Sequence, residues 1–561
     1  MRCALALPRD LAAMADSSDG RKRKSSWDSP LSQEKRSRLP LGPRTLEEVF
    51  DWPTMNAKSL RDADPEAFCR LQAMFARGLS VVSDYSGYFS EMEALVRSWA
   101  GVQKLVNDGE DQDKLECPFE FRRACDCREG PQEVLIEISK QICGGRMCVF
   151  QNLMDRLHPT ARKHMLAVAP SKGASPAMAK NEYKKSFEWL VANRGWALPA
   201  GLMTECLMHN QYCAAYPETT EDDQGLSKVR ISVAGVTCNG WSAMGGGLKY
   251  AHESELIHNI YTCERMVRAE SKHEDIAFTE CTIQYPTSEK LATPLRQHHV
   301  VVWTTTGPEK LGQPCHRLRM LSASICKERY VWVGPEPQKP TEIAKAFGAV
   351  YNKSSEIGGA ALLCGDEYFR MQMYVRMARV QKNYASAAQL AMLPTMQLMQ
   401  TILAPWQLQN FQEWHAIWNK MSPPERRLGL IVDLDQNTDW ARMGGSLWPV
   451  HLSHGVICAW VEGSAPKLAT GLEHFTAHGF HSMPATTTMH KRSPLIPILQ
   501  VIGDTKLKAL AGRGMSIPTM SAWMMWVFGN TVPRQRTVSA RIMRGITFSV
   551  DVDNVDDLEL E

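Results

Sequence analysis

Short apolar runs alternate with longer amphipathic stretches along much of the chain, and this alternation limits the possible folds more than any other feature. The apolar runs predict strands at 79–87, 119–127, 146–153, 229–236, 275–281, 298–306 and 329–334. Amphipathic helices are predicted directly after the first two runs, at 90–106 and 130–142. A strand, a helix and a second strand form a βαβ unit, the building block of a parallel sheet. We therefore predict an α/β fold with a doubly wound parallel sheet.

Changes in composition divide the chain into five segments. Residues 1–45 have little to bury and carry ten Lys/Arg against five Asp/Glu, which predicts a disordered basic tail. The alternating pattern occupies 46–334, fades in a Pro-, Gly-, Gln- and Met-rich stretch at 335–500, and returns at 501–545. Residues 546–561 are acidic and predict a solvated end. The chain should thus have one main domain with an inserted region at 335–500.

Two basic clusters in the tail, Arg21-Lys22-Arg23-Lys24 and Lys35-Arg36-Ser37-Arg38, have the spacing of a bipartite nuclear import signal. This predicts binding to the nuclear import machinery and a location in the nucleus. The alternative is a basic tail that is simply solvated.

Composition excludes several classes of protein. Outside the tail, 54 Lys/Arg stand against 56 Asp/Glu, so any nucleic acid would be bound in a local groove. No stretch approaches the ~18 apolar residues of a membrane-spanning helix, and we expect no membrane association. The 16 cysteines show neither CxxC pairs nor regular spacing, which favours free thiols in a reducing compartment and predicts no metal-ligating set.

The segment VAGVTCNGWSAMGGG, residues 233–247, has the most distinctive chemistry. A strand here leads into a Gly-rich loop that presents Cys238, at the sheet edge where doubly wound folds bind ligands. A thiolate in such a place is a candidate nucleophile. The alternative is a small buried cysteine in a tight turn.

This loop resembles the Gly-Pro-Pro-Cys-Gln-Gly-Phe-Ser catalytic loop of cytosine-C5 DNA methyltransferases, and stands here as 235–242 with Cys238 at the nucleophile's position. AFTECT at 277–282 resembles the family's Glu-Asn-Val motif and places Glu280 at its acid. LGQPCHRLRML at 311–321 resembles its Gly-x-Pro-Gln-x-Arg-x-Arg segment and places Arg317 and Arg319 at its arginines. The resemblance implies that these four residues are catalytic.

Three upstream segments resemble the motifs with which the family binds its cofactor. VVSDYSGYFSEMEAL at 81–95 is similar to the loop after the first strand, RRACDCREGPQEVL at 122–135 to the strand whose acid binds ribose hydroxyls, and MCVFQNLMDRL at 147–157 to the strand whose acid meets the adenine amine. The residues placed at the cofactor are Tyr85, Ser86, Gly87, Tyr88, Asp126, Cys127 and Asn152.

Taken together, the resemblance implies a Rossmann-like methyltransferase domain with an inserted target-recognition domain. It implies transfer of a methyl group from S-adenosylmethionine to cytosine C5 in DNA, with the target base flipped out and Cys238 bonded to C6. RNA is an alternative substrate. A non-catalytic protein that binds nucleic acid is a second alternative, because the chain departs from the family pattern at Phe89, Asn152, Cys281, Cys315 and Arg513.

Overall fold

The computed structural model describes residues 39–107, 117–170, 173–216, 228–236, 239–242, 248–271, 273–436, 438, 445–450, 454–483 and 493–534. The two basic clusters of the tail, Cys238 and the acidic segment 546–561 lie outside these residues. The described elements belong to a compact unit that begins at Leu41.

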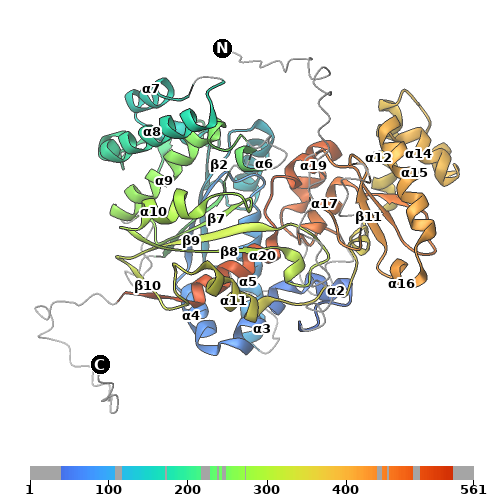
Figure 1. Ribbon diagram of the computed structural model, residues 1–561, viewed down its shortest axis with the longest axis horizontal. Helices are drawn as coiled ribbons and strands as arrows, with labels where there is room; N and C mark the ends of the chain where they lie inside the picture. The colour runs from blue at the N-terminus through green and yellow to red at the C-terminus, as the bar shows by residue number, and fades with distance from the viewer. Residues whose placement is uncertain are drawn as a thin grey trace, which may run out of the picture. The chain divides into compact units, whose positions relative to one another are not determined.

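A seven-stranded sheet forms the centre of this unit, with the spatial order β3-β2-β1-β6-β7-β9-β8 (Figure 1). Neighbouring strands pair in parallel from β3 to β7, whereas β9 runs antiparallel to both β7 and β8. The bounds are β1 (Leu79–Asp84), β2 (Phe119–Cys125), β3 (Cys148–Phe150), β6 (Val229–Gly235), β7 (Ile276–Cys281), β8 (His299–Thr306) and β9 (Arg319–Cys326).

This topology confirms the predicted Rossmann-like, doubly wound α/β fold. The chain builds the sheet outward from β1 through β2 to β3 and then returns to β6 on the other side of β1. Such a reversal creates a crevice at the carboxyl ends of the two central strands, where open α/β sheets bind ligands. Two outcomes differ from expectation: β9 was not predicted as a strand, and β10 (Tyr330–Trp332) pairs outside the sheet with β14 (Thr531–Pro533).

Helices cover both faces of the sheet (Figure 1). Successive residues of a strand point to opposite faces. In β6, Val233 belongs to a core shared with helices α5 and α20, while the next residue, Ala234, belongs to a core shared with α9 and α10. Helix α20 has all 13 of its residues buried, as expected for a helix that is apolar on every side.

The helices of the main body begin where capping residues and prolines favour them. Asp64, for example, accepts a hydrogen bond of 2.8 Å from Ala67 N and precedes Pro65. The bounds are α2 (Leu46–Phe50), α3 (Trp52–Ala63), α4 (Pro65–Ala76), α5 (Ser90–Val106), α6 (Glu129–Gln141), the 3₁₀ turn η2 (Leu153–Arg156), α7 (Pro159–Ala167), α8 (Pro176–Ala197), the 3₁₀ turn η3 (Asn239–Trp241), α9 (Ser254–Glu270), α10 (Thr293–Leu295), α11 (Pro340–Tyr351), α17 (Gly471–Ala477), α18 (Ile496–Gln500), α19 (Asp504–Ala511) and α20 (Ile517–Gly529).

A second core lies within the predicted inserted region. It is built by α12 (Glu367–Val380), α13 (Ala387–Ala391), α14 (Thr395–Ile402), α15 (Pro405–Lys420) and a small sheet of β11 (Leu430–Asp433), β12 (Ile457–Trp460) and β13 (Lys467–Leu468). The short helix α16 (Pro423–Arg426) precedes β11 and has no buried residue. Helix α11 and the segment from α17 to α18, which also fall within 335–500, pack instead into the core of the seven-stranded sheet. The segment 335–500 therefore does not form one separate domain but contributes to several cores.

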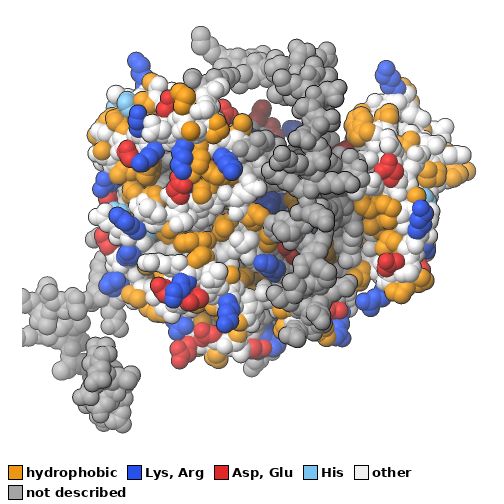
Figure 2. All heavy atoms as spheres, viewed as in Figure 1, with side chains coloured by type: hydrophobic (Ala, Val, Ile, Leu, Met, Phe, Trp, Pro, Cys, Tyr) orange, Lys and Arg blue, Asp and Glu red, His pale blue; other side chains and the backbone are white. Residues whose placement is uncertain are grey.

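The described surface carries charges of both signs, interspersed rather than gathered into one field on the face shown in Figure 2. None of the helices in the described part of the chain has the length and apolarity needed to cross a membrane.

Candidate functional site

Seven buried ionic side chains lie beneath the carboxyl end of β1. Asp84, the last residue of β1, accepts hydrogen bonds from Arg156 Nη1 at 3.2 Å and from Arg123 Nη2 at 3.3 Å. Arg156 Nη1 also lies 2.8 Å from Glu264 Oε2. Burial alone would raise the pKa of Asp84, but the guanidinium groups of Arg156 and Arg123 hold it well below its usual range. The whole buried charge cluster consists of Asp84, Arg123, Arg156, Glu264, Arg265, Arg268 and Glu274.

The turn that follows Asp84 is the segment predicted to hold the cofactor. Tyr85, Gly87 and Phe89 all have left-handed backbone conformations, with φ of 53°, 54° and 67°. Three amides of this turn already donate within the protein: Ser86 N to Cys125 O, Gly87 N to Asp126 Oδ2 and Phe89 N to Ser86 O. The turn is thus fixed against the end of β2, with few amides left for a ligand.

Phe89 does not narrow the space in front of this turn. Its side chain is fully buried and packs against Phe121, with ring centroids 5.4 Å apart and an interplanar angle of 73°. Tyr88 is also fully buried and lies against Phe475 and Phe480. Both residues therefore serve as core aromatics.

Asp126 stands at the carboxyl end of β2, directly beside the turn. Its two oxygens accept from Gly87 N and Arg128 N, each at 3.0 Å. Burial raises the pKa of Asp126, and these two hydrogen bonds and the nearby charge of Arg513 oppose the rise. Cys127 is exposed, and partial desolvation together with Asp126 raises the pKa of its thiol.

Asn152 follows β3 and caps the 3₁₀ turn η2. Its Oδ1 accepts from Met154 N at 2.9 Å. An amide oxygen has two lone pairs, so the same atom retains the capacity to accept a second hydrogen bond. A ligand amine that donates to Asn152 would share Oδ1 with the backbone N–H of Met154.

Glu280 and Arg319 meet at the opposite side of the crevice. Glu280 is the penultimate residue of β7 and is 8% exposed, and its Oε1 lies 3.1 Å from Arg319 Nε. The parallel pairing of β6 with β7 places Gly235 beside Glu280, and Val236 N donates to Glu280 O at 3.0 Å. Glu280 and Arg319 therefore lie at the point where the chain leaves β6 toward Cys238.

Arg317 has a different environment from Arg319. It is buried, its backbone N donates to Glu309 Oε2 at 3.2 Å, and its Nη2 donates to the carbonyl of Gly514. Gly514 lies between α19 and α20. Arg317 therefore links the loop between β8 and β9 to the segment that leads into α20.

Cys238 lies outside the described residues, but the loop is anchored on its far side. Trp241 Nε1 donates to Glu255 Oε1 at 2.8 Å, and His258 Nδ1 lies 3.1 Å from the same oxygen. Burial would raise the pKa of Glu255, but His258 and Lys290 lower it to about 2, so this acceptor is a carboxylate at neutral pH. The described residues on either side of Cys238 are therefore held in place, Val236 by Glu280 and Trp241 by Glu255.

Sequence reasoning did not find the buried charge cluster. The available signals are the acid at the end of strand β1, whose other residues carry no charge, and the adjacent Glu264 and Arg265 within α9. A cavity of about 600 Å³ is lined by α6, Arg376 and the segment from α18 to α19, and contains none of the predicted site residues.

No family model and no curated protein matches the sequence. Similar solved structures include a methyltransferase of Entamoeba histolytica, EhMeth (9% identity, 80% of this chain and 98% of that chain, TM-score 0.36), and the Dnmt2 methyltransferase of S. pombe (10%, 80% and 98%, 0.33). A third is a putative DNA modification methyltransferase from a prophage of E. coli (10%, 81% and 99%, 0.37). TM-scores below 0.5 do not assign a function, so the fold class rests on the strand order of the sheet.

Proposed function

We propose that this protein transfers a methyl group from S-adenosylmethionine to cytosine C5 in DNA through a covalent bond between Cys238 and C6. The observation that carries the proposal is the Glu280–Arg319 pair, 3.1 Å apart at the sheet edge where β6 leads toward Cys238. A nucleophile, an acid and a cation at one edge are what addition to a pyrimidine ring requires.

The chemistry assigns one task to each of the three residues. The thiolate of Cys238 adds to C6, the C5–C6 double bond opens, and C5 becomes nucleophilic. Negative charge develops toward N3, where a protonated Glu280 would donate, and Arg319 would stabilise the charge on O2. After methylation, loss of the C5 proton and departure of the thiolate restore the ring.

The cofactor would lie at the carboxyl ends of the central strands, where the turn after β1 meets the end of β2. S-adenosylmethionine supplies an electrophilic methyl group. Asp126 fits the ribose hydroxyls, because two backbone amides hold its carboxylate at a partly exposed strand end. Phe89 packs into the core and stays out of this space, and Asn152 Oδ1 would accept the adenine amine in addition to Met154 N.

The helical part of the second core suits the target-recognition role. Residues 367–429 contain seven Lys/Arg against three Asp/Glu. Exposed aromatic side chains in this segment include Tyr368, Tyr384 and Trp406. An excess of basic residues together with exposed aromatic side chains is a composition typical of nucleic-acid binding, although one of these arginines, Arg370, is buried against Glu473. The basic tail would bring the protein into the nucleus.

Trapping tests the proposal directly. The full-length protein is incubated with S-adenosylmethionine and a duplex containing 5-fluorocytosine, in which the C5 substituent cannot leave as a proton. We expect an adduct that survives denaturation with wild type and not with Cys238→Ser. Glu280→Gln should slow adduct formation by about 10²- to 10⁴-fold, the usual range for loss of a general acid.

Glu289→Gln is the matched control, since Glu289 is a carboxylate on the surface that pairs with Lys180. It should form the adduct at the wild-type rate. An adduct on structured RNA but not on DNA would show that RNA, and not DNA, is the substrate. No adduct on either nucleic acid, together with no calorimetric binding of S-adenosylmethionine, would refute the proposal in favour of a non-catalytic protein.

A further inference from the structure

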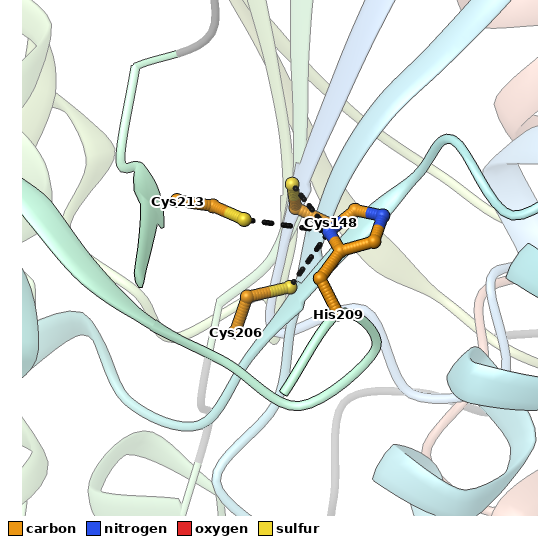
Figure 3. Close-up of side chains that lie close together, drawn as sticks. All are labelled: Cys148, Cys206, His209 and Cys213. Atoms are coloured by element: carbon orange, nitrogen blue, oxygen red, sulfur yellow. Dashed lines mark hydrogen bonds between the residues drawn. The ribbon is translucent and has the colours of Figure 1, made fainter. Parts of the chain in front are cut away.

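Three cysteines and one histidine converge at the edge of the sheet, away from the catalytic pair (Figure 3). They are Cys148, Cys206, His209 and Cys213, and their ligand atoms all lie within 4.8 Å of one another. Cys148 begins the edge strand β3, while the other three belong to the hairpin of β4 (Met203–Cys206) and β5 (Gln211–Ala214). This cluster differs from the expectation that the cysteines, which lack paired spacing, form no metal-ligating set.

Hydrogen bonding alone does not account for this arrangement. The three sulfurs approach one atom, His209 Nδ1, at 3.6 Å from Cys148 and 3.4 Å from each of Cys206 and Cys213. A ring nitrogen has either one lone pair or one hydrogen, so it satisfies at most one thiol. Three sulfurs around one nitrogen are instead the pattern of ligands that share a central ion.

The hydrogen bond on the other side of the ring is the one that a metal-binding histidine needs. His209 Nε2 lies 2.8 Å from the carbonyl of Gly145, and since a carbonyl only accepts, Nε2 carries the hydrogen. The neutral ring then presents the lone pair of Nδ1 to the three sulfurs. A backbone carbonyl that fixes the tautomer in this way is a common partner of metal-binding histidines.

The distances fit a tetrahedral ion. With Zn–S of about 2.3 Å and Zn–N of about 2.0–2.1 Å, a tetrahedral site separates nitrogen from sulfur by about 3.6 Å and sulfur from sulfur by about 3.8 Å. The observed nitrogen–sulfur separations of 3.4 to 3.6 Å match this geometry. The sulfur atoms would need to move by at most about 1 Å, since every pair already lies within 4.8 Å.

We propose that Cys148, Cys206, His209 and Cys213 form a structural Zn²⁺ site. Three thiolates and an imidazole in tetrahedral geometry favour Zn²⁺ over the oxygen-seeking Mg²⁺ and Ca²⁺. Four protein ligands fill the coordination sphere and leave no position for a substrate, so the role is structural.

The site gives the hairpin a fixed place on the sheet. Two four-residue strands are marginal by themselves, and the turn between them includes Asn210 in a left-handed conformation, with φ of 52°. Leu207 N donates to Val149 O at 2.8 Å, so the hairpin meets β3 beside its exposed edge. The ion would join Cys148 of β3 to the three ligands of the hairpin and would keep this edge covered.

The test measures the metal directly in the full-length protein, purified without chelators and dialysed extensively. Mass spectrometry of the elements should find about one zinc ion per chain, and X-ray absorption should show three sulfur ligands and one nitrogen ligand. Cys213→Ser should lose most of the zinc. Cys69→Ser, an exposed cysteine on α4, should retain all of it.

A second measurement keeps the proposal testable if Cys213→Ser fails to fold. Titration of the wild-type protein with a mercurial thiol reagent should release zinc, detected by a chromogenic chelator, in step with the reaction of three thiols. A protein refolded with Zn²⁺ that binds none, a ligand set without sulfur, or a disulfide among the three cysteines in the freshly purified protein would overturn the proposal. These outcomes are independent of the trapping experiment.

Discussion

Glu91→Gln should change how the stability of this protein depends on pH. Glu91 lies in the first turn of α5, two residues after the turn that faces the crevice, and it is fully buried. Ser83 Oγ donates to its Oε1, while its Oε2 has no hydrogen-bond partner among the described residues. Burial raises the pKa of Glu91 from 4.5 to about 7, although the hydrogen bond from Ser83 opposes the rise.

The sign and size of the effect follow from proton linkage. Between pH 4.5 and pH 7 the folded protein holds a proton at Glu91 that the unfolded chain releases, so the free energy of unfolding falls as the pH rises. A gap of about 2.5 pKa units corresponds to about 3 kcal/mol in total, of which about 2.5 kcal/mol is lost between pH 5 and pH 8. Glutamine has the same shape and does not titrate, so Glu91→Gln removes this loss.

Unfolding in guanidinium, followed by tryptophan fluorescence at constant ionic strength, measures the difference between variant and wild type at each pH. We expect a small difference at pH 5 and a variant that is more stable by about 2–3 kcal/mol at pH 8. Glu129→Gln is the control, because Glu129 occupies the first turn of α6 but is exposed. Parallel stability curves for Glu91→Gln and wild type from pH 5 to pH 8 would refute the reasoning.

Two further substitutions test the packing around the crevice. Arg156→Met should lower the free energy of unfolding by about 3–5 kcal/mol, because it takes one of their arginine partners from two buried carboxylates, Asp84 and Glu264. Lys140→Met, at an exposed ion pair, should change it by less than about 0.5 kcal/mol in the same assay. Gly514→Ala should cost about 1–3 kcal/mol by thermal unfolding, since its Cβ would lie 2.0 Å from Cε1 of Tyr88. Gly503→Ala, which meets nothing within 4 Å, should be close to neutral, and equal effects at the two glycines would contradict the packing argument.

The parallel strands were predictable because they are buried on both faces and read as apolar runs. In β1, every residue from Leu79 to Asp84 is buried. Strand β9 escaped prediction because it begins in a basic segment and continues through the small residues Ser322, Ala323 and Ser324. Its burial comes from its place between β7 and β8, which is a property of the sheet and not of the local sequence.

The candidate site was predictable only where strand ends carry it. Asp126 and Glu280 were assigned from the resemblance of their segments to family motifs, and the structure places both near the carboxyl ends of parallel strands. Arg123 could not be recognised, because an arginine in an alternating strand normally faces solvent, whereas this one is fully buried against Asp84. The proposed zinc ligands were missed because Cys148 lies 58 residues before Cys206. The short spacing from Cys206 through His209 to Cys213 was the available signal.

The proposed zinc site and the buried charge cluster meet through one side chain, which makes their coupling measurable. Arg123 Nη1 donates to the carbonyl of Ala215, two residues beyond Cys213, while its Nη2 lies 3.3 Å from Asp84 at the end of β1. A metal that fixes the hairpin therefore also fixes an acceptor of Arg123. Arg123→Lys keeps the charge but, having a single ammonium group, loses the fork that reaches both partners at once.

Removal of zinc should therefore destabilise the wild-type protein more than it destabilises the Arg123→Lys variant. The coupling energy between zinc removal and the substitution should be about 0.5–3 kcal/mol. The measurement is the free energy of unfolding of both proteins with zinc and after chelation. Lys140→Met serves again as the reference, because an exposed ion pair on α6 should add to metal removal within about 0.5 kcal/mol. Strict additivity for Arg123→Lys would mean that the hairpin and the cluster are independent, and that zinc fixes the edge of the sheet without influencing the strand end on which the cofactor turn is built.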